Sequence, residues 1–261
     1  MRQFRGGVQM RSIIWMSLLI LAALTVLSMP AQAFDEVFNK SYHLDSNGSV
    51  ELQNINGSIE IAGWDRDTVE VYAVKYAKSA SADLSRVRID VASAPDHLSV
   101  ATRYPQEKGV EVSVEYHIRV PRHARLTQIG TVNGGVRASH METTGALRSV
   151  NGNVEVFDSA GGFRTQTTNG NLHLELLRLD PSEPVDAETV NGSIQVALRP
   201  NASAALDVHT LNGDFRSDLP VYVQSSIGSS QFRGLLGHGG TQLTLRTVNG
   251  TIRILALNPN V

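Results

Sequence analysis

The sequence predicts an all-β protein, a β-solenoid similar to a parallel β-helix, with coils of roughly 18–22 residues. The first observation is a repeated phrase: "LRTVNGTIRI" at 245–254 has near-copies at 52–61 ("LQNINGSIEI"), 147–156 ("LRSVNGNVEV") and 187–196 ("AETVNGSIQV"). The second is spacing: from Asn133 onward, the Asn residues of successive Asn-Gly pairs lie 18, 18, 22, 21 and 37 residues apart. A period of about 20 residues is typical of stacked repeats. The interval of 37 is close to two units with one signature lost.

The Asn-Gly pairs are the predicted corners of the coils. Asn-Gly supplies the positive φ angles that a tight corner uses. Thr or Ser stands two residues before most of these Asn residues. We expect Thr to stack on Thr and Asn on Asn, with side chains hydrogen-bonded along the axis. The predicted corner residues are Asn56, Gly57, Asn133, Gly134, Asn151, Gly152, Asn169, Gly170, Asn191, Gly192, Asn212, Gly213, Asn249 and Gly250.

An apolar–polar–apolar strand follows each corner, as a half-buried strand requires. The apolar residue just before each Asn has the wrong parity for this pattern, so the strand bends there or leaves an apolar stripe outside. We expect Val190, in that column, and Ile194 to be buried, and Gln195 to accept a charge. The inward columns are Ile59, Val136, Val154, Leu172, Ile194, Phe215 and Ile252, then Ile61, Ala138, Val156, Leu174, Val196, Ser217 and Ile254; the outward column is Glu60, Arg137, Glu155, His173, Gln195, Arg216 and Arg253.

An antiparallel β-meander of Asn-Gly hairpins is the alternative fold, because strand–Asn-Gly–strand is a strong hairpin signal. That fold places Arg246 opposite Arg253 and His209 opposite Arg216, which is unfavourable across a sheet. In a solenoid, equivalent positions stack about 4.8 Å apart, which gives identical columns a physical reason. The repeat therefore favours the solenoid.

The chain divides into three predicted parts. Residues 1–33 read as a signal peptide cleaved after Ala33, because a basic start precedes an apolar run and an Ala-Gln-Ala site; an uncleaved membrane anchor is the alternative. Residues 34–130 are predicted to hold the first coil and an antiparallel β-sheet insertion of four strands that caps the solenoid, with a short helix near 82–86. Residues 131–261 are predicted to be the solenoid repeat region.

Composition excludes several kinds of site. The sequence has no Cys, which excludes disulfides, thiolate metal sites and a lipid-carrying Cys. Three of the 23 Lys and Arg lie in residues 1–33, which leaves 20 against 25 Asp and Glu, a formal charge of −5. A mildly acidic chain without a basic run is not expected to bind nucleic acid. The eight His residues show no metal-ligand spacing, so we expect no metal and no cofactor.

Two stretches carry a family resemblance. "VELQNINGSIEIAGWDRDTVEVYAVKYA" at 50–77 and "GLLGHGGTQLTLRTVNGTIRIL" at 234–255 resemble the bacterial "putative adhesin" family, a domain of unknown function similar to the head domains of GIN-type autotransporter adhesins. The resemblance covers roughly residues 40–257. It implies a β-solenoid on an exported protein and brings no catalytic residues with it.

The sequence thus leads us to expect a non-catalytic, exported protein of the bacterial cell envelope, in the periplasm or on the cell surface. Its adhesin-like surface binds or scaffolds an envelope protein or glycan that the sequence does not identify. A polysaccharide-cleaving β-helix enzyme is one alternative, although the outward column mixes charges and lacks an acidic cluster. An accessory to envelope-stress signalling is another.

Overall fold

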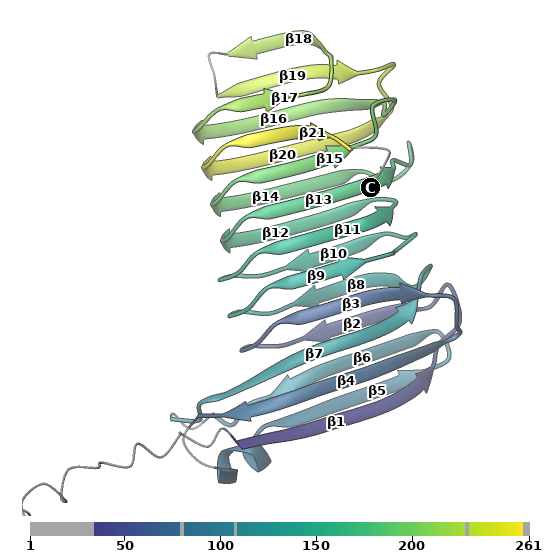
Figure 1. The fold of residues 1–261 in the computed structure, drawn as a ribbon, viewed down its shortest axis with the longest axis vertical. Coiled ribbons are helices and arrows are strands. Elements are labelled where there is room, and N and C mark those ends of the chain that lie inside the picture. The colour runs from purple at the N-terminus through teal and green to yellow at the C-terminus, as the bar shows by residue number, and fades with distance from the viewer. Residues whose placement is uncertain (1–33, 79–80, 107–108, 228–229, 258–261) are drawn as a thin grey trace, which may run out of the picture. The chain divides into compact units, whose positions relative to one another are not determined.

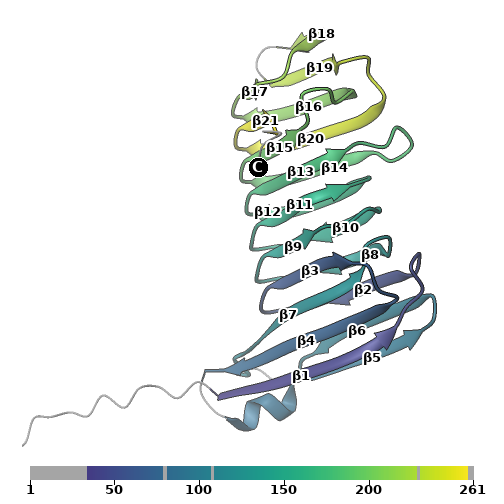
Figure 2. The same ribbon diagram turned by 45° about the vertical axis from the view of Figure 1, so that its right-hand side comes forward.

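Two β-sheets lie face to face and enclose the core (Figures 1 and 2). The computed structural model describes residues 34–78, 81–106, 109–227 and 230–257. The predicted signal peptide therefore lies outside the described residues. Among those residues, no helix has both the length and the apolar character needed to cross a bilayer.

Each sheet contains strands from the whole described chain. In spatial order, sheet A consists of β1 (Phe34–His43), β4 (Thr68–Ala77), β7 (Val112–Pro121), β3 (Ile59–Trp64), β9 (Val136–Ser139), β11 (Val154–Ala160), β13 (Leu172–Arg178), β15 (Ile194–Leu198), β21 (Ile252–Ala256) and β17 (Phe215–Ser217). Sheet B consists of β18 (Val221–Ile227), β19 (Gln231–Leu236), β16 (Ala204–Asn212), β20 (Thr241–Asn249), β14 (Val185–Asn191), β12 (Phe163–Asn169), β10 (Gly145–Arg148), β8 (Arg125–Gly130), β2 (Ser49–Gln53), β6 (His97–Arg103) and β5 (Arg88–Ala94).

Each coil gives one strand to each sheet, and equivalent strands of stacked coils pair in parallel. Leu147 on β10 lies opposite Thr165 on β12, and Val154 on β11 lies opposite Leu172 on β13. A hairpin would instead pair the two strands that flank one corner. The predicted β-solenoid is therefore confirmed, and the alternative meander is excluded.

The order of the coils in space differs from their order in the chain. β20 pairs with both β14 and β16, and β21 pairs with both β15 and β17. The coil of β20 and β21 therefore lies between two coils that precede it in the sequence (Figure 1). The interval of 37 residues is not a lost repeat, because it contains the antiparallel strands β18 and β19, which extend sheet B beyond β16.

At the N-terminal end, too, the order of the coils in space differs from their order in the chain. β6 and β7 pair in parallel with β2 and β3 and form a further coil below them. β4 then pairs antiparallel with β7, β1 with β4, and β5 with β6. The expectation of four antiparallel strands is therefore only partly correct. The expected short helix is present as the 3-10 helix η1 (Ser81–Arg86).

The two inward columns of sheet A form half of the core. From the coil of β3 to the coil of β21, their side chains are buried, with Ile59, Val154 and Ile194 all at 0% exposure. Phe215 and Ser217, on the outermost strand β17, are half-buried. The core thus follows the predicted alternation until the stack ends.

The glycines of the corners are needed because neighbouring backbones come very close. A Cβ atom added to Gly170 would lie 2.1 Å from the carbonyl oxygen of Gly152, and one added to Gly192 would lie 1.9 Å from that of Gly170. Gly57, Gly134 and Gly152 have φ values from +115° to +157°, but Gly170 and Gly192 do not adopt the left-handed region. Positive φ therefore does not explain glycine at several of the corners, contrary to the prediction from the sequence. The close approach of the neighbouring backbone explains it instead.

Two ladders of side chains tie the corners together. The Thr and Ser hydroxyls were expected to hydrogen-bond to one another along the axis, but they do not. Each donates instead to a corner Gly carbonyl of the neighbouring coil, as Thr167 does to Gly152 at 2.8 Å. The Asn amides do bond along the axis: Asn169 Nδ2 donates to Asn151 Oδ1 at 2.9 Å, and Asn191 Nδ2 donates to Asn169 Oδ1 at 2.8 Å. The hydroxyl ladder is buried, and most of the amide ladder is exposed.

The apolar column before the Asn residues forms a stripe on the outside of sheet B. Val190 is 40% exposed, whereas Ile194 is 0% exposed. The expectation that both are buried is wrong for Val190, because the strand keeps its alternation up to the corner and turns this position outward. The stripe consists of Ile55, Val132, Val150, Thr168, Val190, Val248 and Leu211.

Ile194→Asp should destabilise the protein by more than about 4 kcal/mol, because it places a charge in the core. Val190→Asp should change the free energy of unfolding by less than about 1 kcal/mol, since its side chain reaches solvent. Urea melts followed by circular dichroism measure both. Similar losses for the two variants contradict the assignment of Val190 to the outer surface.

Gly170→Ala should cost about 1–3 kcal/mol because the new methyl group meets a backbone carbonyl that cannot move away. Gly135→Ala is the matched control, since its Cβ would lie 3.4 Å from the nearest atom, the Asn153 oxygen. We expect this control to stay within about 0.5 kcal/mol of the parent in the same urea melts. Equal effects of the two substitutions would show that close approach does not select glycine.

Candidate functional site

The predicted corner residues serve the fold and leave little for a ligand. The structure places all seven Asn residues on one ladder, whose amides bond to one another at 2.8–2.9 Å. Their glycines lie against neighbouring backbone. Binding groups must therefore come from the outward faces of the two sheets.

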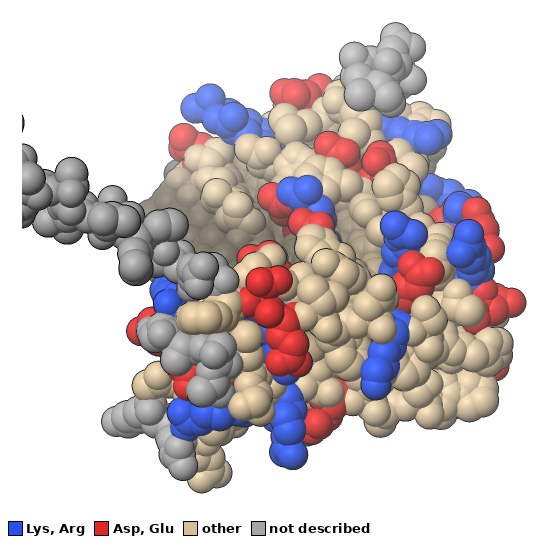
Figure 3. All heavy atoms as spheres, turned by 60° about the horizontal axis from the view of Figure 1, so that its bottom comes forward, with Lys and Arg blue, Asp and Glu red and all other residues tan. Residues whose placement is uncertain are grey.

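The outward face of sheet A engages the charged side chains of its main hollow in contacts with neighbouring residues. Its main hollow, of about 360 Å³, is lined by Glu60, Glu70, Arg119 and Arg137, among others. Each of these four has a hydrogen-bond or ion-pair partner: Glu60 Oε2 lies 3.0 Å from His117 Nδ1, Arg119 lies 3.5 Å from Glu70, and Arg137 lies 2.6 Å from Glu155. Acidic and basic side chains are likewise interspersed in the view from the N-terminal end of the stack (Figure 3).

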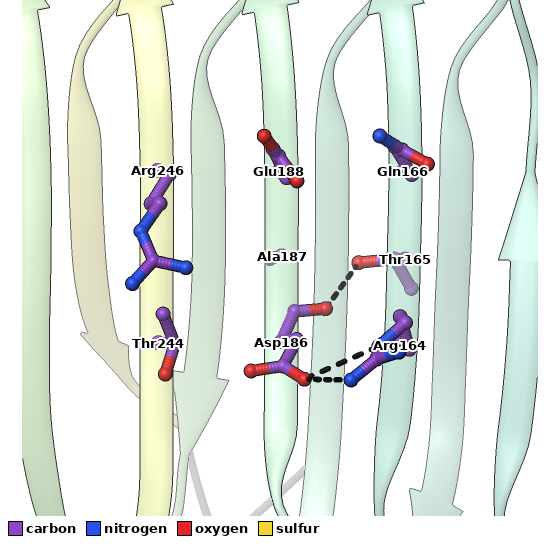
Figure 4. A pocket seen from close by; sticks show the side chains of 8 residues that line it. All are labelled: Arg164, Thr165, Gln166, Asp186, Ala187, Glu188, Thr244 and Arg246. Atoms are coloured by element: carbon purple, nitrogen blue, oxygen red, sulfur yellow. Dashed lines mark hydrogen bonds and ion pairs between the residues drawn. The ribbon is translucent and has the colours of Figure 1, made fainter.

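The outward face of sheet B contains three hollows that share lining residues, and we call them together the sheet B groove. The Glu188 hollow, of about 380 Å³, is lined by Arg164, Thr165, Gln166, Asp186, Ala187, Glu188, Thr244 and Arg246 (Figure 4). The Gly130 hollow, of about 460 Å³, is lined by Gln53, Asn54, Gln128, Ile129, Gly130, Thr131, Val132, Ala146, Leu147, Arg148, Val150, Arg164 and Gln166. The Arg125 hollow, of about 350 Å³, is lined by Arg125, Leu126, Thr127, Thr144, Gly145, Ala146, Gly162, Arg164, Pro184 and Asp186.

Alternation along the strands projects these side chains from the sheet. Residues three and five positions before each corner Asn point outward, and parallel pairing aligns them across neighbouring coils. Gln166 therefore lies between Arg148 and Glu188, and Arg164 lies between Ala146 and Asp186. The groove crosses the strands and follows the direction in which the coils stack.

One end of the groove carries two acidic and two basic side chains, so their charges balance. The Arg164 guanidinium lies 3.0 Å from Asp186 Oδ2, and Glu188 faces Arg246 across β14 and β20 (Figure 4). Beyond the groove, Asp207 is approached by His209 at 2.9 Å, Arg233 at 3.5 Å and Arg246 at 3.8 Å. Such exposed pairs contribute little stability, but they leave no excess charge at this end.

The other end of the groove has two arginines that form no ion pair among the described residues. Within the residues that the structure describes, neither Arg125 nor Arg148 has a carboxylate at ion-pair distance. Both side chains are exposed. Val132 and Val150, from the apolar stripe, form one wall of the Gly130 hollow beside Arg148.

The side chains with clearly shifted pKa values lie away from this groove. Burial raises the pKa of the Tyr116 and Tyr104 phenols, and Tyr116 shares a 2.7 Å hydrogen bond with Thr102. Hydrogen bonds from the Ser182 hydroxyl and backbone N–H lower the pKa of Asp180. None of these residues lines the three hollows. Across the described part of the chain, no group of three or more His, Asp or Glu is arranged to hold a metal ion.

Two outward columns of the repeat were not among the candidate positions predicted from the sequence. Positions three before the Asn residues include Gln53, Gly130, Arg148, Gln166 and Glu188, and positions five before include Ala146, Arg164 and Asp186. The same alignment contains the signal, since both columns follow the outward parity. Arg125 lies outside these columns and could be placed only by the structure.

The sequence profile of the Toastrack DUF4097 family matches residues 25–255. The chain belongs to this family. DUF denotes a domain of unknown function, so membership of the Toastrack family establishes the fold and leaves the ligand open. The resemblance to this domain of unknown function is confirmed.

A solved structure shows the same architecture at low sequence identity, and others match with lower TM-scores. A "putative cell adhesion protein" from Clostridium sporogenes has a TM-score of 0.50 and 10% identity, over 87% of this Toastrack chain and 100% of that one. A "putative adhesin" from Bacteroides fragilis has a TM-score of 0.37 and 12% identity, over 84% and 97%. A "putative lipid binding protein" from Parabacteroides distasonis has a TM-score of 0.28 and 6% identity, over 84% and 96%. No curated protein matches the sequence.

Proposed function

We propose that this chain is a non-catalytic, exported protein of the bacterial cell envelope that binds its partner with the sheet B groove. The observation that carries the proposal is the difference between the two faces. The charged side chains in the hollow on sheet A are engaged by neighbours, whereas the groove on sheet B combines arginines that form no ion pair within the described residues with amide side chains and an apolar wall. Surface that is not engaged within the protein is available to a ligand.

The name of the Clostridium sporogenes protein, a "putative cell adhesion protein" with this fold, supports an adhesin-like role. The leader-like start of the sequence supports export. A rigid stack of coils also suits a binding face, because its side chains are held on strands rather than on mobile loops. Scaffolding of an envelope protein and support of envelope-stress signalling use the same kind of surface.

A polysaccharide-cleaving enzyme is the second candidate, because Asp186 and Glu188 lie in one hollow. Both carboxylates project from the same strand, and the Arg164 guanidinium engages Asp186. A glycosidase instead places its two carboxyl groups on either side of the bond that it cleaves. The geometry therefore favours binding over cleavage.

The absence of Cys from the sequence permits a direct test of the binding face. Gln166→Cys on sheet B and Gln195→Cys on sheet A are matched variants, since both are half-buried outward glutamines in the middle of the stack. Each mature variant is coupled to a bulky maleimide–polyethylene glycol and mixed with isolated bacterial envelopes. We expect coupling at position 166 to reduce envelope capture by about tenfold or more, which corresponds to roughly 1.4 kcal/mol, and coupling at 195 to leave it unchanged.

Two outcomes contradict the proposal. Equal losses at both positions, or loss only at position 195, exclude the sheet B groove as the binding face. Failure of the uncoupled protein to bind envelopes at all argues against an envelope role. Cleavage of an envelope polysaccharide that is lost in Glu188→Gln but retained in Glu175→Gln, on sheet A, would establish the enzyme instead.

A further inference from the structure

The middle of the sheet B groove is hollow because two outward positions carry almost no side chain. Gly130 on β8 lies opposite Arg148 on β10, and Ala146 on β10 lies opposite Arg164 on β12. The Gly130 hollow and the Arg125 hollow both include Ala146 and Arg164. They therefore form one depression over β8, β10 and β12.

The fold does not require glycine at position 130. Of the four glycines inside the described strands, the other three would clash as alanine: the Cβ atom would lie 2.2 Å from backbone at Gly63, 2.7 Å from Phe163 at Gly145 and 2.8 Å from backbone at Gly234. At Gly130 the nearest atom is 3.4 Å away, and φ is not in the left-handed region. Glycine weakens a strand, and in a strand it often marks the close approach of a ligand. The depression over Gly130 fits that role.

Three arginines surround this depression. Arg148 lines the Gly130 hollow, Arg125 lines the Arg125 hollow, and Arg164 lines both. Three carboxylates lie nearby: Asp186 pairs with Arg164, Glu183 accepts a hydrogen bond from the Gly162 N–H, and Glu51 accepts one from Gln53. Within the part of the chain that the structure describes, Arg125 and Arg148 have no carboxylate within ion-pair distance. Guanidinium groups bind carboxylate and phosphate oxygens in bidentate geometry.

We propose that this depression binds an acidic polysaccharide, an inference that rests on the proposed function. Arg125 and Arg148 hold its anionic groups, and the absence of a side chain at Gly130 leaves room for the sugar chain. The amides of Gln128 and Gln166 line the same hollow and suit sugar hydroxyl groups. The groove continues past Arg164 into the Glu188 hollow, so an extended polymer can make several weak contacts along it.

Other ligand classes fit this surface less well. Extended peptides bind sheets by adding to a free edge, but β8 and β10 each pair with a strand on both sides. Single-stranded nucleic acid needs aromatic stacking platforms, and no aromatic residue lines the two hollows. The arginines and glutamines that line the two hollows instead suit a ligand with anionic and hydroxyl groups.

The probe is polygalacturonate, a glycan with a carboxylate on each sugar, and binding is measured by isothermal titration calorimetry on the mature protein. Neutral dextran and poly-L-glutamate are the comparison polymers. We expect polygalacturonate to bind, with an affinity that falls as salt rises, and the other two to bind at least about tenfold more weakly, roughly 1.4 kcal/mol less. Absence of binding to polygalacturonate, or equal binding to poly-L-glutamate, overturns the proposal.

Substitutions distinguish binding at this depression from nonspecific electrostatic attraction to the protein. Arg148→Gln should reduce polygalacturonate affinity by about tenfold (roughly 1.4 kcal/mol). Arg253→Gln should leave the affinity unchanged, because Arg253 is an exposed arginine on sheet A that likewise forms no ion pair with any described residue. Gly130→Val should reduce the affinity as strongly, yet it should keep or raise the melting temperature, because β-branched residues favour strands. Equal loss in Arg148→Gln and Arg253→Gln, or full affinity in Gly130→Val, overturns the site.

The two proposals fail in different ways. If coupling at Gln166→Cys blocks envelope capture but polygalacturonate does not bind, the groove is the binding face and the ligand class is wrong. If polygalacturonate binds and depends on Arg148 while coupling at Gln166→Cys leaves envelope capture unchanged, the anion site exists and the proposed function is wrong.

Discussion

The contact between neighbouring coils at the corners constrains the whole structure. There the carbonyl oxygen of one corner Gly accepts a hydrogen bond from a buried Thr or Ser hydroxyl and lies where a Cβ atom of the next Gly would be. The close approach keeps the corners in register, and register in turn decides which side chains face the core. A buried carbonyl without a partner is costly, so the hydroxyl column is as necessary as the glycine column. The exposed Asn ladder adds further hydrogen bonds outside this contact.

The same regularity produces the binding face. Because every coil repeats its alternation, outward positions align into continuous rows across sheet B, and a single small residue leaves a hollow that no neighbour fills. Gly130 and Ala146 act in this way between rows that contain Arg148 and Arg164. The site therefore differs from the rest of the face by a few side chains, while the backbone beneath it is the same repeated strand.

The sequence predicted the solenoid, its corner residues and the inward columns, because repetition shows which positions are equivalent. It could not predict the order of the coils in space. The coils of Asn191, Asn212 and Asn249 present the same Thr, Asn and Gly to their neighbours. The coil that contains Asn249 can therefore stack on that of Asn191 as readily as on that of Asn212, and the structure uses both contacts. The prediction for Val190 was wrong because an apolar side chain can also lie on the outer surface, where Val190 is 40% exposed. Arg125 was missed because it lies outside the repeat.

The coil of β20 and β21, which lies inside the stack, affects how the protein is made. During synthesis from the N-terminus, strands β14 to β19 are complete before β20 and β21 exist. These last two strands are the ones that lie between the coil of β14 and β15 and the coil of β16 and β17 in the finished structure. Until residues 241–256 arrive, β14 and β16 lack the neighbour that each has in the finished sheet. Open strand edges recruit other chains, so this interval is the point in biogenesis at which aggregation competes with completion. Assembly then ends with the insertion of an internal layer rather than the addition of a terminal one.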